Sequence, residues 1–131
     1  MLFDTTKNIG RAGLALAIAY FGANGYSVSI PLNDTQWYDL IIEKDGELKT
    51  VQCKATGSKD GRIDFRNIGY NGVYDIATNH PIDYLFCLNQ NKTLFNIPTK
   101  DIPKNLKSIM LRTSPNANGI GFETYKYIVE I

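Results

Sequence analysis

The sequence predicts an α+β fold, a mixed sheet with one helix on one face and later short helices on the other. Three observations predict it: an apolar stripe at helical spacing near the N-terminus, two β-branched runs that flank Asp45-Gly46, and further short apolar runs in the second half. At 131 residues, the chain is large enough to bury about two-thirds of its unfolded surface in one core. We therefore expect residues 1–131 to form a single domain.

The first element is a helix that ends near Ala23, where Asn24-Gly25 is a typical C-terminal stop. Its N-terminal cap is Thr5, Thr6 or Asn8, each of which can accept a hydrogen bond from the first turn. Apolar residues recur at i, i+3, i+4 and i+7, which predicts a stripe facing the core: Leu14, Ala17, Ile18 and Phe21.

The next elements are a strand from Tyr26 to Ile30 and a hairpin within 37–54. Asp45-Gly46 favours the positive φ angles of a two-residue turn, so facing residues sum to 91 and Asp39 is expected opposite Gln52. Gln52 and Lys54 share one face because side chains alternate along a strand. A carboxylate, an amide and an ammonium group should thus converge, although an ordinary polar patch on an open sheet face remains the alternative.

The rest of the chain reads as short elements joined by polar loops. We expect strands at 62–66, 82–88 and 93–97, a final strand at 122–131, and helices beginning at 73 or 74 and at 101–109. Cys53 and Cys87 fall inside strands without CxxC spacing, so both are interpreted as buried free thiols.

Charge and hydropathy exclude few functions. The chain has 14 basic and 13 acidic residues and a net charge of +1, which favours no partner. Its longest apolar stretch, Ala12 to Gly22, is too short to span a membrane, and no secretory signal precedes it, so cytoplasmic action is expected. Lys59, Arg62 and Arg66 follow the hairpin closely and are candidates for contacts with DNA phosphates, or simply part of a solvated face.

The residues Tyr38-Asp39-Leu40 and Val51-Gln52-Cys53-Lys54, preceded by Pro31, resemble the core motif of the PD-(D/E)XK nuclease superfamily in its Q-x-K branch. The similarity also covers residues 10–17, 25–32, 82–86 and 95–98. It implies a restriction-endonuclease-like αβββαβ core and a Mg²⁺-dependent endodeoxyribonuclease, with Mn²⁺ as a possible substitute. Small endonucleases of group I introns and phages are the most similar members, so double-stranded DNA and a homo-oligomer, dimer or tetramer, are the implied partners.

The resemblance also implies roles for three residues. Asp39 would bind the metal, Gln52 would offer its amide oxygen to the metal or to water, and Lys54 would polarise the nucleophile or neutralise the phosphate. The family usually carries a helical Glu near the metal, and Leu14 stands at the matching position.

This departure leaves three hypotheses open. Asp4, Asp34, Asp64 or a DNA phosphate completes the metal site of an active nuclease. Alternatively, the chain is a degenerate nuclease fold that binds DNA or protein without cleavage, or the polar hairpin is only surface decoration on a small α+β domain.

Overall fold

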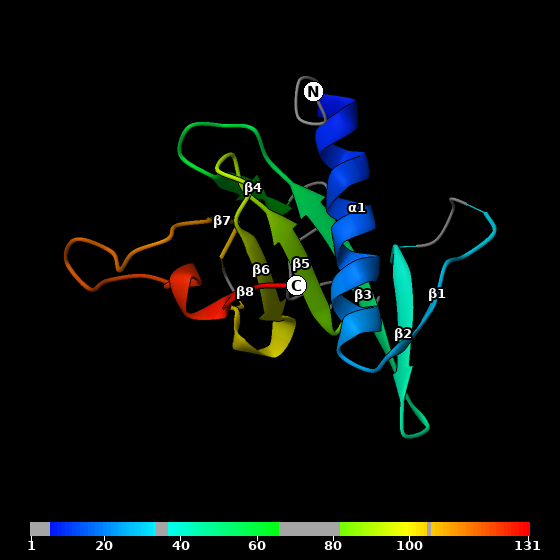
Figure 1. Cartoon of the computed structure of the whole chain (residues 1–131). Coiled ribbons are helices and arrows are strands. Elements are labelled where there is room, and N and C mark those ends of the chain that lie inside the picture. The colour runs from blue at the N-terminus through cyan, green and yellow to red at the C-terminus, as the bar shows by residue number, and fades with distance from the viewer. Residues whose placement is uncertain (1–5, 34–36, 66–81, 105) are drawn as a thin grey trace.

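The computed structural model describes residues 6–33, 37–65, 82–104 and 106–131. In chain order its elements are α1 (Thr6–Ala23), β1 (Ser27–Ser29), β2 (Leu40–Lys44), β3 (Glu47–Ala55), β4 (Arg62–Asp64), β5 (Tyr84–Leu88), β6 (Leu94–Pro98), the 3₁₀ turn η2 (Thr99–Asp101), β7 (Ser108–Met110), the 3₁₀ turn η3 (Thr124–Tyr127) and β8 (Ile128–Val129) (Figure 1). In the described ranges, no helix is both long enough and apolar enough to cross a membrane.

Six strands form one sheet in the order β1-β2-β3-β5-β6-β8, and β4 pairs with β7 in a separate two-stranded ribbon. Within the large sheet β3 and β5 are parallel, whereas the other neighbours are antiparallel. The parallel step requires a crossover between β3 and β5, and β4 lies within it. The predicted α+β fold with a mixed sheet is confirmed.

The end of α1 follows the predicted stop. Gly25 adopts a φ of +87°, and its N–H donates to the carbonyl of Gly22 over 3.2 Å. The N–H of Tyr26 donates to the carbonyl of Phe21 over 3.0 Å, so two carbonyls of the last turn are satisfied. The rings of Phe21 and Tyr26 also meet edge to face, which directs the chain from the helix into β1.

The β2–β3 hairpin has the predicted register. Asp45 and Gly46 both have positive φ, at 56° and 81°, and pairing runs from Lys44 opposite Glu47 to Leu40 opposite Val51, each pair summing to 91. The carboxylate of Glu43 accepts a hydrogen bond from the N–H of Gly46 over 2.9 Å and so stabilises the turn.

Apolar side chains cover the large sheet on both faces. The helix side contains Ala12, Ala17, Phe21, Leu40, Ile42, Val51, Phe86, Leu88 and Leu94. The opposite side, here called the ribbon side, contains Ile63, Phe65, Ile82, Leu85, Cys87, Phe95, Ile97, Ile102, Ile109 and Leu111. Successive residues of β5 alternate between the two clusters, as a pleated strand requires.

Short helices were expected on the ribbon side. Within the described ranges this side is covered instead by β4 and β7, while the helix expected from residue 73 or 74 lies outside those ranges. The helix expected at 101–109 is wrong, because 108–110 pair with β4 and Ile109 is buried in the ribbon-side cluster.

The final strand is much shorter than expected. Residues 124–127 form η3, and only Ile128–Val129 pair with β6. The reason is a tertiary contact: the buried hydroxyl of Thr124 donates to the carbonyl of Met110 over 2.7 Å and accepts the N–H of Arg112 over 2.9 Å. These bonds tie the start of η3 to the end of β7.

Candidate active site

Asp39 lies just before β2, at the point where regular pairing with β3 stops. The last pair is Leu40 with Val51, and the N–H of Asp39 donates to the carbonyl of Val51 over 2.8 Å. The predicted backbone pairing of Asp39 with Gln52 is therefore not formed. The carboxylate Oδ2 instead accepts the N–H of Cys53 over 2.7 Å, so Asp39 is attached to β3 between Gln52 and Lys54.

Gln52 and Lys54 share a face of β3, as predicted. They pair with Leu85 and Cys87 of β5, whose side chains lie in the ribbon-side cluster. The amide and the ammonium group are each half-buried on that side. The sequence motif thus brings its polar groups to the sheet face opposite α1.

The charges of Asp39 and Lys54 perturb one another. Burial raises the pKa of Asp39, while the N–H of Cys53 and the positive charge of Lys54 act in the lowering direction. Burial lowers the pKa of Lys54, and the negative charge of Asp39 opposes that effect. Each group is thus removed from water and partly compensated by the other, an arrangement often found at functional sites.

The other positions considered for a metal ligand lie in different elements. Leu14, at the position of the family's helical Glu, packs against the helix-side cluster, and Asp64 lies in β4. The carboxylate of Glu43, farther along β2, is engaged in the hairpin turn. Asp4 and Asp34 fall outside the described ranges. Across those ranges, no group of three or more His, Cys, Asp or Glu side chains could hold a metal ion.

The donors that remain are oxygen atoms, which suit a hard divalent ion. Oδ2 of Asp39 accepts the N–H of Cys53, and its Oδ1 accepts no hydrogen bond within the described part of the chain. The amide of Gln52 likewise has no hydrogen-bond partner among those residues. One carboxylate and one amide fit Mg²⁺, because this ion keeps several waters and needs few protein ligands.

Two of the three basic residues predicted to contact DNA lie within the described ranges. Lys59 is exposed in the loop before β4, and Arg62 is exposed in β4 itself; Arg66 lies outside the described ranges.

The two cysteines are free thiols in strands. Cys87 is fully buried and Cys53 is half-buried, and burial raises the pKa of Cys87 to about 12. Burial likewise raises the pKa of Cys53, so both thiols favour the protonated form, as buried structural cysteines do.

Sequence reasoning missed the polar side chains of β7. The segment Ser108-Ile-Met-Leu-Arg112 alternates polar or long side chains with aliphatic ones, the signal of a half-buried strand. A helix was expected at 101–109, so the exposed position of Arg112, just after β7, was overlooked.

Comparison with known proteins bears on the whole chain. A family model described as PD-(D/E)XK endonuclease matches residues 4–123. The structure of a bacterial homing endonuclease, I-Ssp6803I, aligns with a TM-score of 0.69 and 21% identity over 95% of this chain and 86% of that one. No functionally curated protein matches the sequence significantly.

A second solved structure is more distant. Hjc of Archaeoglobus fulgidus, a Holliday junction resolvase from an archaeal hyperthermophile, aligns with a TM-score of 0.54 and 9% identity over 77% of this chain and 83% of that one. At such identities both likenesses concern the fold, and the fold agrees with the family match.

Proposed function

Because the chain belongs to the PD-(D/E)XK endonuclease family, we propose that it is a metal-dependent endonuclease that hydrolyses phosphodiester bonds in double-stranded DNA. The single observation that carries the proposal is the attachment of the Asp39 carboxylate to β3 between Gln52 and Lys54. That contact holds the carboxylate against β3 next to Gln52 and Lys54, whose side chains share the ribbon side of the sheet. We further propose that it acts as a homing or phage nuclease, supported by the fold that it shares with the bacterial homing endonuclease I-Ssp6803I.

Asp39 and Gln52 are the residues that would hold the cation, Mg²⁺ or Mn²⁺. When bound, such an ion supplies a water of lowered pKa and neutralises charge that develops on the phosphate. The N–H of Cys53 fixes the carboxylate of Asp39 through Oδ2, and Oδ1, which accepts no hydrogen bond from the described residues, is the oxygen proposed to bind the cation. The amide of Gln52 also orients water by hydrogen bonding.

Lys54 acts on the substrate. Its ammonium group donates hydrogen bonds to the scissile phosphate and holds the attacking water in line. Partial burial makes this charge more effective, because fewer waters compete for the phosphate at that point.

The test is cleavage of plasmid DNA with Mg²⁺ or Mn²⁺ by the wild type, Asp39→Ala and Lys54→Ala. Asp45→Asn and Lys100→Ala are matched controls, since both positions are exposed and Asn tolerates the positive φ of residue 45. Nicking that is lost in the first two variants and kept in the controls supports the proposal. Equal nicking by all five proteins overturns it.

A second candidate function is DNA binding without cleavage. Leu14 favours it, since an apolar side chain packs against the helix-side cluster where the resembled family carries a glutamate. DNA retardation by the wild type with no cutting under either metal would support this candidate.

We also propose a homo-oligomer, dimer or tetramer. One site of this kind hydrolyses one strand, so two copies are needed to cut both strands of a duplex in one encounter. Light scattering of the purified chain, with and without a DNA duplex, measures the assembly mass directly, and a monomer under both conditions would contradict this point.

A further inference from the structure

The β4–β7 ribbon has two chemically different faces. Its pairs are Arg62 with Met110, Ile63 with Ile109, and Asp64 with Ser108. Ile63 and Ile109 are buried in the ribbon-side cluster. Because side chains alternate along strands, the opposite set faces outward, and we call it the outer face: Arg62, Asp64, Ser108, Met110 and, just after β7, Arg112.

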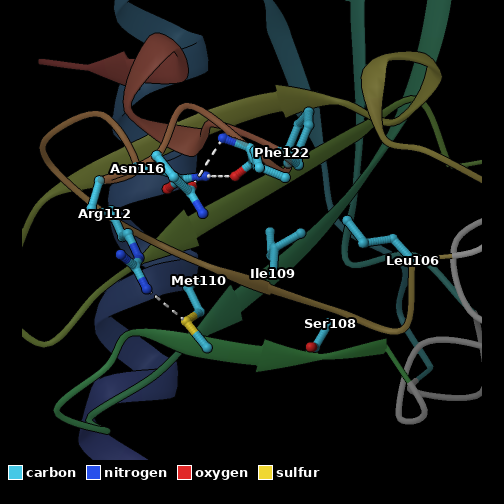
Figure 2. Close-up of a pocket in the computed structure, with 10 residues that line it drawn as sticks. Leu106, Ser108, Ile109, Met110, Arg112, Asn116 and Phe122 are labelled. Carbon is cyan, nitrogen blue, oxygen red and sulfur yellow. Dashed lines mark hydrogen bonds between the residues drawn. The ribbon is translucent and has the colours of Figure 1, made fainter.

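Arg112 is held in place while its guanidinium group remains available. Its backbone N–H donates to the buried hydroxyl of Thr124, and its Nη2 lies 3.3 Å from the sulfur of Met110 (Figure 2). Sulfur is a weak acceptor, and among the described residues this is the hydrogen bond that the guanidinium group makes. In the described part of the chain, neither Arg112 nor Arg62 forms a salt bridge with a carboxylate.

The loop after Arg112 is ordered by its own hydrogen bonds. Asn116 Nδ2 donates to the carbonyl of Ile120 over 2.7 Å, and the N–H of Ile120 donates to Asn118 Oδ1 over 3.1 Å. Gly119 and Gly121, with φ of 68° and 94°, leave Ile120 between them at 72% exposure. Loop and β7 together border a hollow of about 490 Å³ beside Arg112 (Figure 2).

The charge of this region suits a polyanion. The exposed basic residues around the ribbon number four against three carboxylates, those of Asp60, Asp64 and Glu123, a net charge of +1. Two of these carboxylates are already engaged, because Asp60 Oδ1 accepts the hydroxyl of Ser58 and the backbone N–H of Arg62, and Glu123 Oε1 accepts the N–H of Asn116. The basic residues are Lys59, Arg62, Lys107 and Arg112.

The ribbon also lies on the same side of the large sheet as the candidate active site. It packs on the same side of the large sheet that carries Gln52 and Lys54, away from α1 (Figure 1). The chain passes from β3 to β4 within a few residues, and Gln90 Nε2 donates to the carbonyl of Lys59 over 3.0 Å, which anchors that connection to the sheet. A duplex whose phosphate contacts Lys54 would therefore continue across the ribbon.

We propose that the outer face of the β4–β7 ribbon reads base sequence in the major groove of duplex DNA, with Arg62 and Arg112 as the base-contacting residues. The inference rests on the proposed DNA-directed function. A two-stranded ribbon fits the major groove, and the fork of an arginine matches the two acceptors of guanine. Ile120 at the loop tip offers an apolar contact of the kind that recognises a thymine methyl group.

The experiment selects bound sequences from a library of randomised DNA duplexes, with Lys54→Ala in every protein to prevent cutting. Arg62→Lys and Arg112→Lys are compared with Arg11→Lys, an exposed arginine on α1 across the sheet. Lysine keeps the charge but loses the fork. Each ribbon variant is expected to lose about 5- to 150-fold in preference for guanine at one position, with the salt dependence of binding unchanged, whereas Arg11→Lys changes neither.

The outcomes separate this inference from the proposed function. Unchanged base preference in both ribbon variants overturns the inference, and so does a wild type that binds duplexes without any preference, while DNA binding itself stands in both cases. No retained duplex, together with no plasmid cleavage by the protein with Lys54 intact, overturns the proposed function instead. An unchanged melting temperature verifies that each lysine variant is folded.

Discussion

The candidate active site and the β4–β7 ribbon both present charge on the same side of the large sheet, but in opposite settings. Asp39 and Lys54 are half-buried. Burial raises the pKa of Asp39 and lowers the pKa of Lys54, so it favours the neutral form of each group. Arg62 and Arg112 project into water from a ribbon whose other face is apolar and buried. The partly buried charges of the first region lower the stability of the fold, whereas the hydrated charges of the second region hardly affect it.

This difference separates chemistry from recognition. A group that acts on a phosphate is most effective where water is scarce, so its site strains the folded state. A group that contacts DNA by charge or by base edges can stay hydrated until the duplex arrives. We therefore expect that replacing a half-buried charge lowers cleavage and keeps or raises stability, whereas replacing an exposed arginine changes DNA recognition and leaves stability unchanged.

The largest expected effect comes from Lys54→Met. Cleavage should fall by about 10²- to 10⁴-fold, since the loss of one positioned catalytic group has effects of this size. The melting temperature should stay equal or rise, because a partly desolvated charge beside Cys87 is replaced by an apolar chain. Rate assays and thermal melts measure both; a clearly lower melting temperature would mean that Lys54 is structural.

The next expected effect is on the support of the ribbon. Ile109→Ala should lower the free energy of unfolding by about 2–5 kcal/mol, as truncation in a packed core does. It should also weaken DNA binding at denaturant concentrations too low to unfold the whole chain. Ile42→Ala on the helix side is the matched control, expected to destabilise similarly without that selective loss. Denaturant unfolding and DNA binding at low denaturant compare the two, and equal binding losses would remove the distinction between the regions.

A smaller effect is expected at the link between η3 and β7. Thr124→Val keeps the shape but leaves the carbonyl of Met110 and the N–H of Arg112 without their partner, at about 1–3 kcal/mol. Preference for guanine should weaken at the same base position as in Arg112→Lys, because Arg112 loses the hydrogen bond that anchors its backbone. Thr113→Val, at an exposed neighbouring position, is the control and should change neither stability nor preference.

The smallest expected effect is a pH dependence in the metal-free protein. Because burial raises the pKa of folded Asp39 above 3.8, the wild type should lose stability as pH rises from about 4 through that raised pKa. Asp39→Asn has no such group, so the two proteins should be similar in acid, and the variant should be more stable near pH 7. Urea unfolding at several pH values measures the free energy of unfolding of both proteins. If the wild type becomes more stable relative to the variant as pH rises, the hydrogen bond from Cys53 outweighs the effect of burial on Asp39.

Much of the hairpin was predictable because it is local. Asp45-Gly46 determines the turn, the turn determines the register, and alternation then puts Gln52 and Lys54 on one face. The end of α1 at Asn24-Gly25 is local in the same sense, since only residues within two turns take part. Asp39 is the exception: extrapolated pairing placed it opposite Gln52, yet its side chain replaces a strand carbonyl for the N–H of Cys53.

The ribbon was not predictable in the same way. Residues 101–109 carry Pro103 near an expected first helical turn, and a helix seemed reasonable, but β7 forms because β4, more than 40 residues earlier, offers it a partner. Strand pairing across such a separation leaves no pattern in either segment beyond weak alternation.

By itself, the amino-acid sequence determined the helix, the hairpin and the pairing of an amide with a lysine on one strand face, because neighbours in the chain set each of these. Only the tertiary structure decided that the ribbon covers the opposite side of the sheet, that Thr124 ties η3 to β7, and that Arg62 and Arg112 share an outer face. Those features depend on which distant segments bury each other's apolar side chains, and burial is a property of the whole fold.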